Sequence, residues 1–178
     1  MKKILTSLAL VVFSLSVWAA PAESKAVAPT RALIERIAPQ HSANIELKLL
    51  PKKGGDRFEL SSNGDKILIA ANNVNSLAVG FNYYLKYYCN TTVSWWADDA
   101  IILPEVLPAV PEKVSVSARS ENRFFLNYCT YGYTMPWWGW REWERLIDWM
   151  ALQGVNLPLA ITGQEAVWQK VWSSFGMT

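Results

Sequence analysis

Residues 123–175 read RFFLNYCTYGYTMPWWGWREWERLIDWMALQGVNLPLAITGQEAVWQKVWSSF, a stretch that predicts two strands alternating with two helices. An extended aromatic run over 123–129 precedes a helix over 140–153, which Gly154 is expected to end. A short apolar strand over 155–161 and a second helix over 164–175 follow. Strand, helix, strand, helix with short loops is the pattern of a parallel sheet, so the predicted fold class is α/β.

Side-chain alternation along 123–129 singles out a candidate binding end. In a strand, Phe125, Asn127 and Cys129 share one face. The opposite face, which is expected to pack under helices, holds Phe124, Leu126 and Tyr128. Ligands bind at the carboxyl ends of βα-barrel strands, so Asn127 and Cys129 are predicted to point into a pocket mouth. The alternative is a satisfied core asparagine with a buried thiol.

Glu165 is the carboxylate that follows the second strand. It is a candidate ligand-binding or acid/base residue. Thr162 and Glu165 also form the S/T-x-x-E pattern of a capping box, in which Glu165 returns to the backbone of Thr162. The two roles are compatible and both remain open.

The helical segments carry their own expectations. A buried stripe is predicted for Trp143, Ile147 and Met150. Trp168 and Trp172, at i and i+4, are expected to pack against a wall or a neighbouring helix. Trp137 and Trp138, in the loop, either line a site or pack internally. A solvated charged face is expected for the side chains of Arg141, Glu142, Glu144, Arg145 and Asp148.

The upstream half predicts a small helix-plus-sheet unit. A helix from Thr30 ends before Pro39, and alternating strands follow around 45–49, 58–60 and 67–69. Asn63-Gly64 predicts a hairpin with a type I′ turn, which needs positive φ at both central residues. A helix is expected over 75–88. The prolines at 104, 108 and 111 mark a boundary, so residues 23–112 form an N-terminal α/β domain and 113–178 the next one.

Residues 1–22 resemble a secretory signal peptide. Lys2-Lys3 precedes about 14 apolar residues, too few for a membrane span, and small residues allow cleavage after Ala19 or Ala22. An exported protein, periplasmic or extracellular, is therefore expected. Removing Lys2 and Lys3 from the 17 basic residues leaves 15, equal to the 15 acidic ones. A neutral chain has no electrostatic basis for binding nucleic acid, or a membrane after signal cleavage.

Few residues are available for metal or nucleophilic chemistry. His41 is the single imidazole and is expected at the surface, so no zinc, haem or other cofactor site is predicted. Cys89 and Cys129 are the two thiols. Export favours a disulfide between them, whereas their separation in the sequence disfavours it.

The stretch 124–172 resembles the opening of the catalytic barrel of the α-N-acetylglucosaminidases, glycoside hydrolase family 89. The resemblance rests on Asn127-x-Cys129-Thr130, the tryptophans at 137, 138 and 140, Trp143-Glu144-Arg145, the run 148–152, and Gly163-Gln164-Glu165-Ala166-x-Trp168. The upstream unit is similar to the small α/β domain that precedes the barrel in that family. The implied fold is that domain followed by the first two βα units of a truncated TIM barrel.

The resemblance implies removal of terminal α-linked N-acetylglucosamine from glycans with retention of configuration. Retention uses two carboxylates about 5–5.5 Å apart, and the family carries them on later barrel strands. No catalytic residue is therefore assigned within residues 1–178, and this chain alone is expected to be inactive. The substrate-binding residues that the resemblance carries over are Asn127, Cys129, Tyr133 and Glu165. A pocket-lining Cys129 would disfavour the disulfide.

Three other interpretations remain open on the sequence. The chain could be a non-catalytic secreted glycan-binding protein, or the remnant of a decayed glycosidase gene. It could also belong to another barrel glycosidase with a similar leading domain. The residues do not indicate the natural glycan or the oligomeric state.

Overall fold

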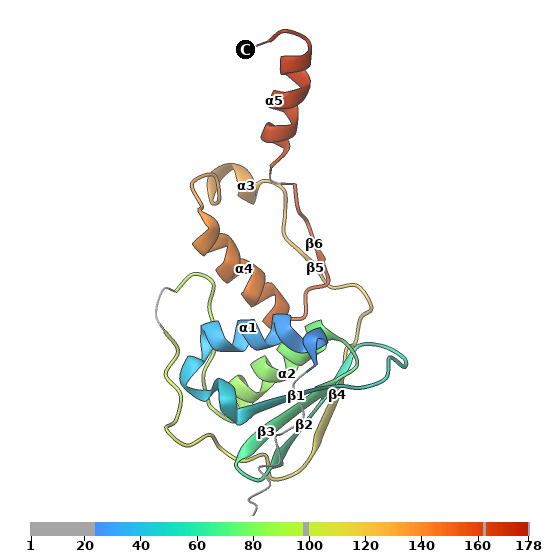
Figure 1. Cartoon of the computed structure of the whole chain (residues 1–178), viewed down its shortest axis with the longest axis vertical. Coiled ribbons are helices and arrows are strands. Elements are labelled where there is room, and N and C mark those ends of the chain that lie inside the picture. Colours follow the sequence, from blue (N-terminus) through green and yellow to red (C-terminus); the bar gives the residue numbers. More distant parts are fainter. Residues whose placement is uncertain (1–23, 98–99, 162, 178) are drawn as a thin grey trace, which may run out of the picture.

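The computed structural model describes residues 24–97, 100–161 and 163–177. The predicted signal peptide lies outside the described residues. Two parts follow one another along the chain (Figure 1). We call residues 24–117 the N-terminal unit and residues 123–177 the barrel segment.

The N-terminal unit is built on a four-stranded sheet. Its strands are β1 (Ile45–Leu49), β2 (Arg57–Asn63), β3 (Lys66–Ala71) and β4 (Val114–Ser117), in the order β1-β3-β2-β4. β1 runs parallel to β3, whereas β2 is antiparallel to both of its neighbours. The sheet therefore continues past residue 112, because β4 lies in the part that the predicted boundary gave to the next domain.

Two helices cover one face of this sheet. α1 (Ala28–Ile37) follows a 3-10 turn, η1 (Lys25–Val27), and precedes another, η2 (Pro39–Asn44). α2 (Val74–Tyr87) begins after Asn73, whose side chain accepts a hydrogen bond from the backbone N–H of Ser76. Both helices agree with the sequence prediction. Between helices and sheet lies a closed core that includes Leu60, Ile69, Phe81, Tyr84 and Leu85, each no more than 1% exposed.

The hairpin is confirmed, but its predicted turn type is wrong. Asn63 pairs with Lys66, so Gly64 and Asp65 are the two central residues. Only Gly64 has a positive φ, of 61°. A glycine with positive φ at the first central position followed by a residue with negative φ is typical of a type II′ turn, because glycine alone tolerates that position without strain.

The barrel segment contains one parallel strand pair. β5 (Phe124–Phe125) pairs with β6 (Leu157–Pro158), and α3 (Thr130–Tyr133) and α4 (Trp140–Leu152) lie between them in the chain. The sheet is not closed. Both strands are shorter than the runs 123–129 and 155–161 that were expected to be extended. The chain leaves β5 early because Asn127 begins a turn into α3.

α4 confirms the predicted helix, and Gly154 ends it with φ of 76°. The buried side of α4 differs from the predicted stripe: Leu146 and Leu152 are buried, while Ile147 is 45% exposed. The helix is turned in this way because its C-terminal half packs on α2, which places Leu152 in the core of the N-terminal unit.

The expected solvated face of α4 is also wrong for Asp148, which is 8% exposed. Its two carboxylate oxygens accept hydrogen bonds from Arg36 of α1 at 2.7 and 2.6 Å. Asn82 of α2 donates to the carbonyl of Leu152 at 2.9 Å, which satisfies a backbone group at the helix end. The N-terminal unit thus holds the C-terminal half of α4 by charge, hydrogen bonds and apolar packing.

α5 (Gln164–Ser174) leads away from the strand pair beyond the carboxyl ends of β5 and β6 (Figure 1). Its predicted packing is not seen: Trp168 is 61% and Trp172 50% exposed, and the ring of Trp172 lies 6.4 Å from that of Phe175, which directly follows α5. Thr162 lies outside the described residues, so the capping box stays a prediction. Gly163 occupies the N-cap position of α5.

The structure places His41 differently from the prediction and shows no bond between the two cysteines. His41 was expected at the surface, but it is 9% exposed because η2 turns it toward the molecule. Cys89 and Cys129 are both free, the first buried and the second exposed. No disulfide joins them.

Candidate active site

Three of the four predicted binding residues lie on one turn that follows β5. Asn127, Cys129 and Tyr133 fall within seven residues of chain, at the carboxyl end of the strand. Asn127 and Cys129 are exposed, and Tyr133 is 68% exposed. In this structure neither Asn127 nor Cys129 is buried, which argues against a core asparagine with a buried thiol.

The local structure that orients these residues differs from the predicted one. Strand alternation does not orient them, because β5 ends at Phe125. The side-chain oxygen of Asn127 instead accepts hydrogen bonds from the backbone N–H of Thr130 at 3.2 Å and from its hydroxyl at 3.0 Å. An asparagine that caps its own chain in this way competes with strand formation. The turn is therefore encoded by Asn127 and Thr130.

The prediction that Phe124, Leu126 and Tyr128 pack beneath helices is also wrong in part. Phe124 is 61% and Tyr128 70% exposed, although both were expected beneath helices. Phe125 packs there instead, with its ring centroid 5.2 Å from that of Trp149 of α4. Leu126 agrees with the prediction, since it lines an apolar cavity against α4.

Glu165 lies apart from the other three predicted residues. It is exposed in the first turn of α5, and within the described residues no hydrogen bond or ion pair joins it to Asn127, Cys129 or Tyr133. A carboxylate in the first turn of a helix is stabilised by the helix dipole. The geometry thus supports a helix-end role and leaves a ligand role as a proposal.

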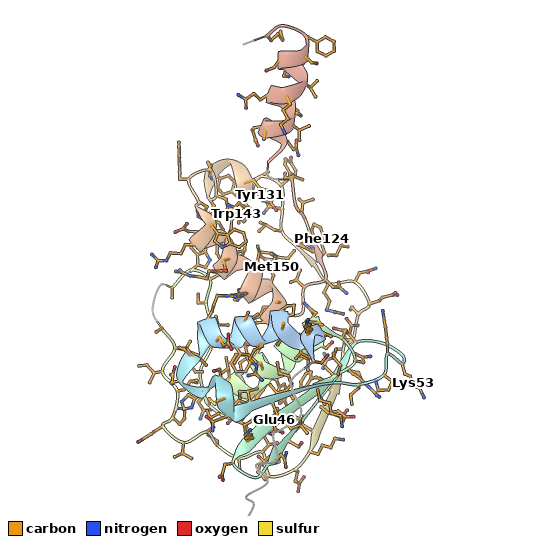
Figure 2. The ribbon with its side chains drawn as sticks, in the orientation of Figure 1. Glu46, Lys53, Phe124, Tyr131, Trp143 and Met150 are labelled. Carbon is orange, nitrogen blue, oxygen red and sulfur yellow. The ribbon has the colours of Figure 1, made fainter. Side chains whose placement is uncertain are left out.

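Beneath the turn lies an apolar cavity of about 320 Å³ between α4 and the strand ends. Tyr131 and Trp143 stack over it with centroids 5.9 Å apart and planes inclined by 18° (Figure 2). The Tyr131 hydroxyl donates to the carbonyl of Leu159, which ties α3 to the end of β6. Burial raises the pKa of Tyr131, so this hydroxyl remains a donor.

An aromatic network joins the two parts of the molecule, and the sequence analysis missed it. Its rings are contributed by the loop after α2, by β5, by α3, by the loop before α4 and by α4 itself: Trp95, Trp96, Phe125, Tyr131, Trp138, Trp143 and Trp149. Of the two loop tryptophans left open above, Trp138 packs into the network, while Trp137 is 91% exposed. The tryptophan density of 137–149 was the available signal, but Trp95 lies far from it in the chain.

A second hollow, of about 420 Å³, lies between α1, α4 and the residues that flank 98–99. Its polar wall holds the Arg36–Asp148 pair, with Glu144 3.8 Å from Arg36. The same acids raise the pKa of Arg36, chiefly through the hydrogen bond to Asp148. The charges of this hollow therefore hold α1 and α4 together.

Among the described residues, no group of three or more histidine, cysteine, aspartate or glutamate side chains is placed to hold a metal ion. In the same ranges, no helix is long and apolar enough to cross a membrane.

Two family models match the chain in order. The α-N-acetylglucosaminidase N-terminal domain matches residues 28–109, and the α-N-acetylglucosaminidase TIM-barrel domain matches residues 123–178. Human α-N-acetylglucosaminidase is 37% identical over 166 residues, which cover 90% of this chain and 22% of the human protein.

Solved structures give the same result. A family 89 glycoside hydrolase from Clostridium perfringens, in complex with PUGNAc, is 39% identical with a TM-score of 0.79, over 86% of this chain and 18% of that one. A variant of the Clostridium enzyme in complex with its substrate GlcNAc-α-1,4-galactose matches equally well. The chain spans about a fifth of the length of these relatives. The N-terminal unit and the barrel segment together place the chain in the α-N-acetylglucosaminidase family, glycoside hydrolase family 89.

Proposed function

We propose that this chain provides part of the sugar-binding wall of an exported enzyme that removes terminal α-linked N-acetylglucosamine from glycans. The observation that carries the proposal is the turn after β5, which presents Asn127, Cys129 and Tyr133 together at a carboxyl strand end. Family membership supplies the substrate class, since the Clostridium relative was solved with GlcNAc-α-1,4-galactose.

Asn127 is the residue best prepared to bind a sugar. Its oxygen is engaged by Thr130, and among the described residues its Nδ2 amide makes no hydrogen bond. The amide plane is thus fixed and its N–H groups are available. They can donate to a sugar hydroxyl or to the acetamido carbonyl of N-acetylglucosamine.

Tyr133 and Cys129 would contribute surface to the same wall. The exposed ring of Tyr133 offers a flat apolar face with a polar hydroxyl, which suits the C–H face of a sugar. Cys129 offers a small apolar group beside it. Glu165, in the first turn of α5, would accept hydrogen bonds from sugar hydroxyls.

Hydrolysis itself is assigned to groups outside this chain. A retaining glycosidase needs a nucleophile and an acid/base carboxyl about 5–5.5 Å apart. The turn after β5 carries no carboxylate, and we propose that the catalytic pair lies beyond residue 178. We also propose export to the periplasm or outside the cell, on the basis of the N-terminal sequence over 1–22.

A sugar titration tests the binding role. Methyl α-N-acetylglucosaminide is added to purified residues 24–178, and chemical shifts are followed by NMR. We expect Asn127→Asp, which keeps the oxygen that Thr130 engages and removes the amide N–H donors, to weaken binding about threefold to tenfold. Asn122→Asp, at an exposed asparagine two residues before β5, is the matched control and should bind as the unchanged chain does. Equal binding by both variants would contradict the assignment.

An activity assay tests the division of labour. Residues 23–178 should not hydrolyse an aryl α-N-acetylglucosaminide, whereas the full reading frame that contains them should. Turnover by the purified 23–178 chain would place a catalytic pair within it. A stop codon directly after Thr178 would instead favour the non-catalytic glycan-binding protein or the gene remnant.

A further inference from the structure

We propose that Trp95 is a positioning residue for the substrate-binding turn. It belongs to the N-terminal unit, in the loop after α2, yet its ring lies among side chains of the barrel segment. The proposal rests on the proposed function of Asn127, Cys129 and Tyr133. It adds a role for the N-terminal unit, which contributes none of those residues.

The first line of contacts runs from Trp95 to α3. The ring of Trp95 meets that of Trp138 edge-on, with centroids 5.8 Å apart. Trp138 meets Trp143 in the same manner at 5.2 Å, and Trp143 stacks on Tyr131 of α3 at 5.9 Å. Tyr131 therefore has a packed aromatic path back to the N-terminal unit.

The second line of contacts runs from Trp95 to β5. Trp95 lies 6.3 Å from Trp149 of α4, and Trp149 lies 5.2 Å from Phe125 of β5. Asn127 falls between Phe125 and Tyr131 in the chain. Both flanks of the candidate binding residue are thus supported by rings that converge on Trp95.

The loop that carries Trp95 is itself held to the barrel segment. Arg145 of α4 donates a hydrogen bond to the carbonyl of Ala97 at 3.1 Å. Trp96 stacks on Trp95 at 4.1 Å but is 69% exposed, so it covers the Trp95 ring from the solvent side. Aromatic pairs in edge-on or stacked geometry are favourable beyond their buried area, and their geometry restricts the rings they join.

A positioning role predicts a local loosening when the ring is removed. The amides of Thr134 and Met135 both donate to the carbonyl of Thr130, at 2.9 and 3.3 Å, and they report on α3. In the 24–178 chain, Trp95→Ala should speed hydrogen exchange at these two amides about tenfold, because both of its aromatic contacts with the barrel segment are lost. Amides of β3 should keep their protection.

Two further variants separate positioning from general destabilisation. Trp95→Phe retains a ring and should recover most of the protection at Thr134 and Met135. Trp168→Ala removes an equal side chain from α5, where it is 61% exposed and outside the aromatic network, and should leave both amides unchanged. If Trp95→Ala unfolds the chain, Trp95→Leu keeps apolar volume without the ring contacts and should show the same local loosening.

The sugar titration then links position to binding. Trp95→Ala should weaken binding of methyl α-N-acetylglucosaminide, and Trp95→Phe should restore it. Unchanged exchange at Thr134 and Met135 in Trp95→Ala and Trp95→Leu would overturn the proposal. If the unsubstituted chain binds no sugar, the proposed function of the turn is contradicted. Faster exchange in Trp95→Ala would in that case still support the structural role of Trp95.

Discussion

The N-terminal unit and the barrel segment use apolar residues in opposite ways. In the first, Phe81, Tyr84 and Leu85 are enclosed between two helices and a four-stranded sheet. In the second, Phe124, Trp168 and Phe175 are more than 60% exposed, and the sheet has two short strands. A closed core stabilises a fold by burial, whereas a two-stranded ribbon has little to bury. Within the described residues, the barrel segment therefore depends on its contacts with the N-terminal unit for stability.

Separating the two parts should give the largest effect. Residues 24–119, made alone, should keep their sheet and unfold cooperatively in urea, because the core lies almost wholly within them. Residues 120–178 should show no cooperative transition and should tend to aggregate through exposed apolar side chains and strand edges. Circular dichroism and analytical ultracentrifugation provide the measurements. Cooperative unfolding of the isolated 120–178 peptide would show that the barrel segment is ordered by itself.

A matched pair of phenylalanines compares the parts within one chain. Phe81 is 1% exposed and Phe124 61%. Phe81→Ala should lower the free energy of unfolding by about 3–5 kcal/mol, since it opens a cavity in a closed core. Phe124→Ala should change it by less than about 0.5 kcal/mol. Urea denaturation at pH 7 measures both, and similar losses would mean that Phe124 is covered in solution.

The Arg36–Asp148 pair is a direct link between the parts. Asp148→Asn removes the charge of a carboxylate that accepts two hydrogen bonds from a partly exposed Arg36. We expect a loss of about 1–2 kcal/mol, read from the urea midpoint and from faster exchange of the α4 amides. Glu144→Gln, 3.8 Å from Arg36, is the control and should cost less than about 0.5 kcal/mol. A larger loss of stability in Glu144→Gln than in Asp148→Asn would show that Glu144, and not Asp148, is the main partner of Arg36.

Alkaline pH should weaken the closed core. Burial first, and then the neighbouring Cys89, raise the pKa of Tyr84 above its ordinary value. Tyr84 therefore keeps its proton in the folded state above about pH 10, where the unfolded chain loses it, so its stabilising contribution falls as pH rises from there. Tyr84→Phe should flatten this decline in urea midpoints between pH 9 and 11, while Tyr87→Phe, 66% exposed, should not. If the urea midpoint of Tyr84→Phe falls as steeply with pH, the loss of stability comes from the ionisation of other groups.

The sequence predicted what depends on neighbouring residues. The helices α1, α2 and α4 and the β2–β3 hairpin follow from apolar spacing, prolines and an Asn-Gly pair, which act over one or two turns. The parallel pairing of β5 with β6 follows from the order of elements. The family resemblance, carried by Asn127-x-Cys129-Thr130 and the downstream motifs, is confirmed by the matches to both family models.

Features that depend on distant residues could not be predicted. Asp148 is buried because Arg36 meets it from 112 residues away. Trp95 joins the aromatic network from a loop that lies far in the chain from its ring partners Trp138 and Trp149. The early end of β5 had a local cause, the cap that Asn127 forms with Thr130, but the aromatic run around it favoured a longer strand. Asn127 is thus a case in which a polar side chain overrides the propensity of its neighbours.

The two free thiols differ in a way that has practical value. Cys89 is 7% exposed and burial raises its pKa, so little reactive thiolate is available to reagents at neutral pH. Cys129 is exposed on the candidate turn. A maleimide dye added to the native chain should therefore attach at a single position, beside Asn127, without any engineered cysteine. The natural sequence thus offers a fluorescent reporter of sugar binding at the site where it is proposed to occur.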